Sequence, residues 1–247
     1  MTGRSLSWGR SLILLAALLG VLASAALGRW QLRRADEKQL LVDQRLSQAA
    51  MAPVLGVDLG RPDEGLEKRQ ALLHRPVLLK GRWEASKTVY LDNRQMQGRA
   101  GFYVVTPLVL TGTDAAILVQ RGWVARSFTD RQSLPQVSTP EGEVSLQAHL
   151  APWPSRMYDF AGVERGPIRQ NLDLNDFRAE TGLPLLEVSA AQAGPASEGL
   201  LREWPQVASG IEKHHGYAFQ WFGLSALIAL LYVWFQIVQP LRKQKNG

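Results

Sequence analysis

Two uncharged apolar blocks, one near each end of the 247-residue chain, constrain its fold more than any other feature. The first covers residues 11–27 (SLILLAALLGVLASAAL) and the second covers residues 217–238 (YAFQWFGLSALIALLYVWFQIV). About 20 apolar residues are needed to cross the hydrocarbon core of a bilayer. The second block has 22 residues and contains no Asp, Glu, Lys or Arg. We therefore predict transmembrane helices over residues 11–29 and 217–238.

The first block is shorter, which leaves one alternative open. Trp8 and Trp30 flank it with rings that favour the headgroup region, and they bring the segment to spanning length. However, Arg4 and Arg10 also resemble the basic start of a signal peptide, and the small residues at 23–25 (ASA) resemble a cleavage site. Because the second block already indicates a membrane protein, we favour a retained helix over a cleaved signal peptide.

The distribution of basic residues predicts the orientation in the membrane. Cytoplasmic segments of membrane proteins carry an excess of Lys and Arg, and both the segment 1–10 and the tail 239–247 are basic. The stretch 29–38 is also basic, but a long domain is translocated largely regardless of its charge. We therefore expect a multi-pass protein of the bacterial inner membrane, with two cytoplasmic tails and residues 30–216 in the periplasm.

Composition excludes several classes of function. The net charge is +6, but the basic residues are scattered and do not line one helix face, so we expect no nucleic-acid partner. Cysteine is absent, which excludes disulfides and thiolate metal sites. Copper(I) delivery favours Cys or clustered Met, whereas the four methionines here, Met1, Met51, Met96 and Met157, lie far apart in the sequence.

Catalytic motifs do not stand out either. The sequence contains no GxSxG, GxxxxGK[ST] or HExxH, and no GxGxxG following a strand. His74 and His149 fall in predicted strand contexts without a motif around them, so we interpret both as surface or packing histidines. We expect no catalytic residues and predict that the protein is not an enzyme.

The region between the apolar blocks predicts an α+β fold in which strands dominate. Residues 30–49 combine helix-forming residues without Gly or Pro, which predicts a helical stalk, whereas residues 53–65 have the composition of a loop. Runs of alternating β-branched and aromatic residues then predict strands over 77–83, 88–91, 102–106, 117–119, 144–150 and 185–188. We expect the first four to form an antiparallel meander, with turns at 92–93, 97–98 and 111–114.

A short helix is predicted late in this region. Asp173 is suited to cap the amides of residues 175 and 176, and Gly182 followed by Pro184 is suited to end the helix. The strings Gly81-Arg82-Trp83 and 120–123 (QRGW) end two predicted strands. An arginine over a tryptophan there is either a cation-π pair or a rim that contacts a partner, and we favour a structural bend at the glycine before Trp123.

One histidine lies where a ligand-binding role is chemically reasonable. If the second apolar helix extends back beyond residue 217, then His214, Tyr217, Ala218 and Trp221 fall on one stripe. A neutral imidazole is a good axial ligand of haem iron, and the adjacent apolar surface could cover a porphyrin at the lipid boundary. The simpler interpretation is that these residues are interfacial anchors.

Several strings, taken in order, resemble the Surfeit locus protein 1 family, which includes the yeast protein Shy1, over nearly the whole chain. They are LGRWQL at 27–32 with Arg34 and Lys38, RPV at 75–77 with Gly81, GFYVVTPL at 101–108, LVQRGWV at 118–124, and His214 with Tyr217, Trp221, Phe222 and Gly223. The chain departs from the family pattern at Glu212, Gln220 and Ala125.

This resemblance implies an assembly factor for haem-copper cytochrome c oxidase. It implies binding of haem a, or help in its insertion, during maturation of subunit I, with that subunit, other assembly factors and membrane lipid as partners. His214 matches the family's proposed haem ligand, so we expect it to bind the iron, with Tyr217 and Trp221 beside the cofactor. Because His215 is adjacent, the resemblance leaves open which of the two imidazole rings binds the iron. The alternative function is a cofactor-free scaffold that stabilises nascent subunit I.

Overall fold

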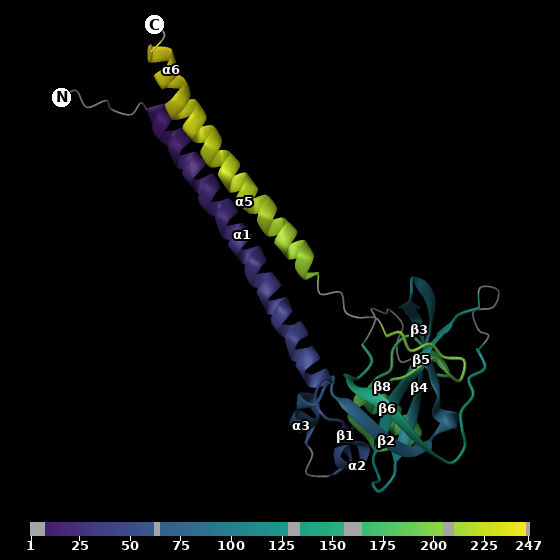
Figure 1. Cartoon of the computed structure of the whole chain (residues 1–247). Helices are drawn as coiled ribbons and strands as arrows, with labels where there is room; N and C mark the ends of the chain where they lie inside the picture. Colours follow the sequence, from purple (N-terminus) through teal and green to yellow (C-terminus); the bar gives the residue numbers. More distant parts are fainter. Residues whose placement is uncertain (1–7, 62–64, 128–133, 156–164, 205–209, 246–247) are drawn as a thin grey trace. The chain divides into compact units, whose positions relative to one another are not determined.

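The computed structural model describes residues 8–61, 65–127, 134–155, 165–204 and 210–245. Contacts divide the chain into two compact units (Figure 1). Residues 1–43 and 207–247 form one unit, called here the helical hairpin, and residues 44–206 form the other, called the β domain. Met1, Arg4 and Met157 lie outside the described residues.

Two long helices form the hairpin. The chain enters it through α1 (Trp8–Ala49) and leaves it through α5 (Ile211–Val233), a π-helical turn η2 (Trp234–Val238) and α6 (Gln239–Lys245). Because α1 continues without a break to Ala49, the predicted helical stalk is confirmed. Helix α5 begins before residue 217 and includes His214, as the predicted stripe requires. Both helices are long and apolar enough to cross a membrane.

Small residues allow α1 and α5 to approach each other closely. A Cβ atom at Gly28 would lie 2.9 Å from the ring of Phe222, so a larger side chain does not fit without movement. The hydroxyl of Ser225 donates a hydrogen bond to the carbonyl of Val21 at 3.2 Å. Ser24 is buried, and its hydroxyl bonds to a carbonyl of its own helix. Small and hydroxyl-bearing residues at the contact are typical of helices that associate in lipid.

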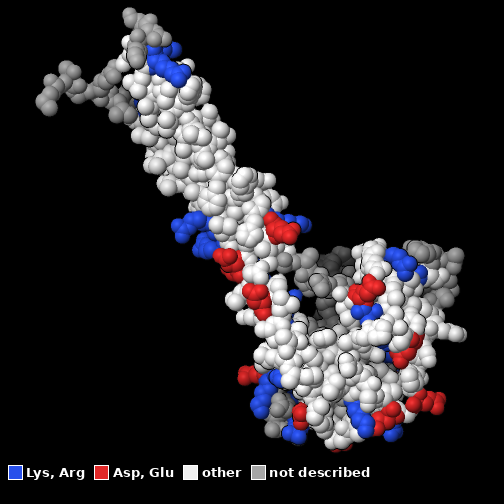
Figure 2. Space-filling model, viewed as in Figure 1, with Lys and Arg blue, Asp and Glu red and all other residues white. Residues whose placement is uncertain are grey.

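The large apolar side chains of the hairpin point outward. Phe219 is 80% exposed, and Leu230 is 67% exposed. On the face seen in Figure 2, the described residues leave a long stretch of the hairpin without Lys, Arg, Asp or Glu, and charged residues gather toward its two ends. An exposed apolar surface of this kind is compatible with a helix pair that crosses a membrane.

The β domain is built on one mixed sheet of β1 (Val54–Leu55), β2 (Pro76–Trp83), β3 (Val89–Met96), β4 (Arg99–Leu110), β5 (Ala116–Ala125), β6 (Glu143–Pro152), β7 (Ile168–Arg169) and β8 (Leu185–Gln192). The strand order is β1-β2-β6-β8-β5-β4-β3-β7, and β2 also pairs with β4, which closes the sheet like a small barrel. Helices α2 (Gly56–Leu59), α3 (Leu66–Ala71) and α4 (Leu174–Thr181) and the 3-10 turn η1 (Ala85–Lys87) complete the domain.

The predicted strands all occur, but the predicted meander is wrong at its first strand. Strands β3, β4 and β5 follow one another as antiparallel neighbours, whereas β2 pairs with β6 and with the far end of β4. The reason is length: β4 has 12 residues and β3 has 8, so β4 extends beyond β3 and offers its free end to β2. Parallel ladders β1–β2, β3–β7 and β5–β8 make the sheet mixed, and the other ladders of the described strands are antiparallel.

Two local predictions also need correction, and one is confirmed. The predicted loop 53–65 contains β1 and α2. The predicted turn at 92–93 is an irregularity within β3, where Asn93 has φ 59°, so the connection to β4 lies at Gln97 and Gly98. Helix α4 is as predicted, because the Asp173 carboxylate accepts hydrogen bonds from the two predicted amides and Gly182 ends the helix at φ 68°.

Arg121 is the most deeply buried of the three buried arginines among the described residues, which also include Arg94 and Arg169. Arg121 is 0% exposed, with its guanidinium 4.9 Å from the centre of the Trp83 ring and 2.9 Å from the carboxylate of Glu198. A Cβ atom at the following Gly122 would lie 2.7 Å from the Cβ of Leu200. The contact between Arg121 and Trp83 is the cation-π option of the sequence analysis, and the close packing at Gly122 matches the structural role predicted for this glycine. A fully buried Arg121 cannot form a rim that contacts a partner.

Candidate functional site

The candidate site begins at His214, in the first turn of α5. The Nδ1 of its ring lies 2.7 Å from the side-chain oxygen of Gln31 on α1. Both residues are half-buried, so this polar pair bridges the two helices of the hairpin. The histidine is therefore held by a specific contact and does not project freely from its helix.

The other predicted site residues lie around this pair in different environments. Ala218 is 2% exposed and Trp221 is half-buried, whereas Tyr217 is 53% exposed. The predicted stripe therefore combines covered positions with an outward-facing one. Tyr217 and the neighbouring Phe219 present an apolar aromatic surface on the outside of the hairpin. The assignment of His214, Tyr217 and Trp221 to a cofactor stays a prediction.

Two basic side chains of α1 lie near the histidine. Lys38 and Arg34, from the part of α1 that follows Gln31, act electrostatically on the His214 ring. Arg34 also forms an exposed ion pair with Glu37 at 2.8 Å. The site thus combines an imidazole, exposed aromatic side chains and cations that suit a ligand with carboxylate groups.

The neighbouring His215 differs from His214 in its surroundings. It is exposed. Consecutive residues of an α-helix point about 100° apart, because a turn contains 3.6 residues, so the two rings leave the helix in different directions. Of the two, His214 is the ring that the tertiary structure orients. Gln31 was missed as a partner, because nothing in the sequence connects residues so far apart in the chain.

The donor set fits a haem better than a chelated metal ion. Within the described residues, no group of three or more His, Cys, Asp or Glu side chains could hold a metal ion. Haem iron is already held by the porphyrin, so a protein needs to supply only an axial ligand, and a single imidazole meets that need. Apolar side chains beside His214 would pack against a porphyrin, and the nearby cations would attract its propionates.

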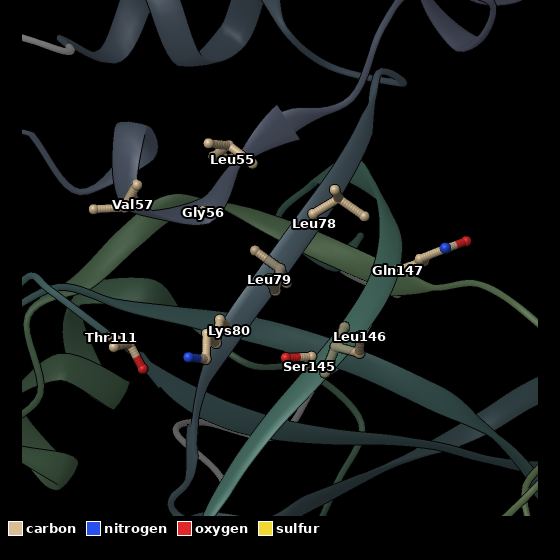
Figure 3. A pocket seen from close by; sticks show the side chains of 10 residues that line it. All are labelled: Leu55, Gly56, Val57, Leu78, Leu79, Lys80, Thr111, Ser145, Leu146 and Gln147. Carbon is tan, nitrogen blue, oxygen red and sulfur yellow. The ribbon is translucent and has the colours of Figure 1, made fainter.

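Among the described residues of the β domain, two depressions are sizeable. An apolar groove of about 660 Å³ is bounded by side chains of β1, α2, β2 and β6, among them Leu55, Leu78 and Leu146 (Figure 3). Its described lining includes no histidine or carboxylate. A cleft of about 900 Å³ is lined by arginines, where Glu187 pairs with Arg178 at 3.2 Å.

The two histidines of the β domain line neither depression. His149 is exposed, and His74 is half-buried with a positive φ of 71°. Burial lowers the pKa of His74, and the charge of Arg45 and the nearby His149 lower it further. These features match the interpretation of the two as surface and packing histidines.

Comparison with known proteins identifies members of one family, which match most of the chain. A sequence profile described as the SURF1 family matches residues 18–226. A SURF1-like protein of Rickettsia bellii is 26% identical over 224 residues, which is 88% of each chain. Surfeit locus protein 1 of Homo sapiens is 29% identical over 237 residues, 89% of this chain and 75% of the human one. The cytochrome oxidase assembly protein SHY1 of Saccharomyces cerevisiae is 26% identical over 194 residues, 76% of this chain and 48% of the yeast one.

Proposed function

Because the chain belongs to the SURF1 family, we propose that it is a membrane-anchored assembly factor for cytochrome c oxidase. The yeast relative is named as a cytochrome oxidase assembly protein, and the matched region includes most of both long helices. The partners are oxidase subunit I and other assembly factors. The protein acts as a chaperone and not as an enzyme with turnover.

The proposed anchor is the helical hairpin, with both helices retained in the bilayer. Its support is the burial pattern, in which small residues such as Gly28 are covered and large ones such as Phe219 are exposed. The bond from Ser225 to the carbonyl of Val21 ties the first helix to the second, and cleavage after residue 25 would remove it. With two spans, both tails lie in the cytoplasm and the β domain lies in the periplasm of a bacterial inner membrane.

The proposed cargo is haem a, which the protein holds before or during its insertion into subunit I. The observation that carries this proposal is the placement of His214, an oriented imidazole near the start of an apolar helix, beside exposed aromatic side chains. His214 supplies the iron ligand, Tyr217 and Trp221 contact the porphyrin, and Lys38 and Arg34 attract its propionates. Haem a supplies the redox chemistry only after its transfer to the oxidase.

Purified protein tests this function directly. The full chain, extracted in detergent from cells that make haem a, should show a haem a spectrum. His214→Ala should abolish the spectrum, whereas the neighbouring His215→Ala should retain it. A colourless wild-type preparation that still carries oxidase subunits would support the cofactor-free scaffold instead. Normal haem a content in the oxidase of a His214→Ala strain would rule out the ligand role.

A further inference from the structure

We propose that Gln31 selects the tautomer of His214 in which Nδ1 carries the proton and Nε2 is the bare nitrogen presented to haem iron. This inference rests on the proposed function, since it concerns how the same site receives its ligand. It makes Gln31 a positioning residue, which acts on the cargo through the histidine. The sequence strings quoted above include Gln31 but give it no role.

Hydrogen-bond chemistry determines which nitrogen of the His214 ring carries the proton. A side-chain amide oxygen has lone pairs and no hydrogen, so it can only accept. The atom that faces it at 2.7 Å is Nδ1 of His214, so in this arrangement of the amide Nδ1 donates. A neutral imidazole has only one N–H, so a protonated Nδ1 leaves Nε2 with its lone pair. A metal is bound through that lone pair.

The other ring nitrogen, Nε2, is left available for a ligand. Within the described part of the chain, the ring makes its hydrogen bond to Gln31 through Nδ1, and no protein partner takes up Nε2. Hydrogen bonds from the far nitrogen of a metal-bound histidine fix the tautomer and the orientation of the ring, and they increase the basicity of the ligand. Gln31 stands in this relation to His214 before any haem is present.

Gln31 can select a tautomer of His214 only if its own position is fixed, because a partner on a mobile segment would not hold the ring. Gln31 lies one turn after Gly28, where the two helices pack so closely that a Cβ atom would be 2.9 Å from the Phe222 ring. The Ser225 to Val21 hydrogen bond lies further along the same contact. The backbone positions of both partners are therefore set by the hairpin, and ring rotation would break the bond to Gln31.

A rotated amide is the competing arrangement. If the amide nitrogen of Gln31 faced the ring, it would donate to a bare Nδ1 and leave the proton on Nε2. Such a ring has no lone pair on the outer nitrogen and cannot ligate iron there. The two arrangements therefore make opposite predictions for a measurement that needs no haem.

That measurement is nitrogen NMR of the haem-free protein. The full chain, labelled with ¹⁵N-histidine and held in detergent above pH 8, should show the signals of neutral imidazoles, and the His214 signals are identified by their loss in His214→Ala. We expect His214 to be protonated on Nδ1, and Gln31→Leu to remove this preference. An Nε2–H tautomer in the wild type, or an unchanged tautomer in Gln31→Leu, would overturn the inference.

Haem titration gives the second measurement, with haem a as the probe. The loss of such a partner typically costs about 10–100-fold in metal affinity, so we expect that weakening for Gln31→Leu. Gln31→Glu keeps an acceptor and should restore binding, with a lower midpoint potential because a carboxylate donates more charge to the ring. Gln39→Leu is the matched control, since Gln39 lies on the same helix and bonds to Asp43 at 2.8 Å. Equal affinity and potential in all four proteins would contradict the inference.

The two measurements separate this inference from the proposed function. If His214→Ala still binds haem a like the wild type, the ligand role fails whatever the tautomer is. If the wild type binds haem through His214 but the free ring is protonated on Nε2, only the role of Gln31 fails. A structural role alone predicts that Gln31→Glu and Gln31→Leu differ in stability, with no shift in potential.

Discussion

The helical hairpin and the β domain bury opposite kinds of residue. In the hairpin, Ser24 and Ala218 are covered whereas Phe219 is 80% exposed. In the β domain, Phe102 and Trp123 are buried. The same chain therefore follows two sets of burial rules.

The difference is the one expected if the hairpin crosses a membrane, as proposed, while the β domain folds in water. In water, burial of large apolar side chains stabilises a fold, by about 25 cal/mol per Å² of apolar surface. In lipid that term is absent between helices, so close contact of small residues and a few hydrogen bonds hold the helices together. Polar contacts thus have different roles, since Gln31 joins two helices while Arg121 is enclosed by its partners.

The largest expected effect tests the enclosed arginine. Arg121→Ala should destabilise the β domain by about 3–5 kcal/mol, because it leaves a cavity beside Trp83 and removes the hydrogen bonds of a fully buried guanidinium. Urea unfolding of the full chain, followed by tryptophan fluorescence, measures the loss. The control is Lys80→Ala, which breaks an exposed pair with Glu143 and should change the stability little, because solvent screens the two charges. A similar loss in both variants would show that burial does not distinguish the pairs.

The next effect tests the small-residue contact in the hairpin. Gly28→Leu should cost about 1–3 kcal/mol of helix association, because the new side chain overlaps the Phe222 ring. The chain has no cysteine, so a pair introduced at Val21 and Ser225 gives a clean disulfide crosslinking assay. We expect its yield to fall with Gly28→Leu and to persist with Gly223→Leu, since a Cβ at Gly223 would meet no atom of another described element within 4 Å. Unchanged crosslinking in both glycine variants would show that close contact of small residues does not hold the hairpin together.

A smaller effect tests a water-exposed helix end of the β domain. Asp173→Ala should cost about 1 kcal/mol, because it removes the acceptor for two backbone amides at the start of α4. Its neighbour Asp176 lies in the same turn but does not cap it, so Asp176→Ala should cost less. The urea midpoints of the two variants provide the test, and an equal shift would show that Asp173 has no specific capping role.

The smallest effect is a pH dependence in the β domain. Burial, Arg45 and His149 lower the pKa of His74 in the folded state from its usual 6.5. Below pH 6.5 the unfolded chain therefore takes up a proton at this residue more readily, so its contribution to stability is present above that pH and is lost as the pH falls. His74→Asn, which tolerates a φ of 71°, should flatten the stability profile between pH 7 and pH 5. An identical profile in the variant would exclude His74 as the source.

Local chemistry made much of the fold predictable. The cap at Asp173 and the end of α4 at Gly182 depend on neighbours within one turn, so the residues alone sufficed to predict them. The apolar blocks and the alternating runs were equally direct, because burial on one face imposes a period on the sequence. The pairing of the strands was harder to predict from the sequence. That β2 meets β6 and the end of β4 depends on relative strand lengths and on the closure of the sheet, which no short window contains.

The candidate site divides in the same way. The sequence by itself determined that a histidine stands at the start of an apolar helix, because hydropathy and helical spacing are properties of contiguous residues. Only the tertiary structure decided that Gln31 meets this ring at 2.7 Å while His215 is left exposed. The two partners are separated by 183 positions, and their contact exists because small residues bring α1 and α5 together. A hydrogen bond of that kind is a product of packing, and packing is decided only when distant parts of the chain meet.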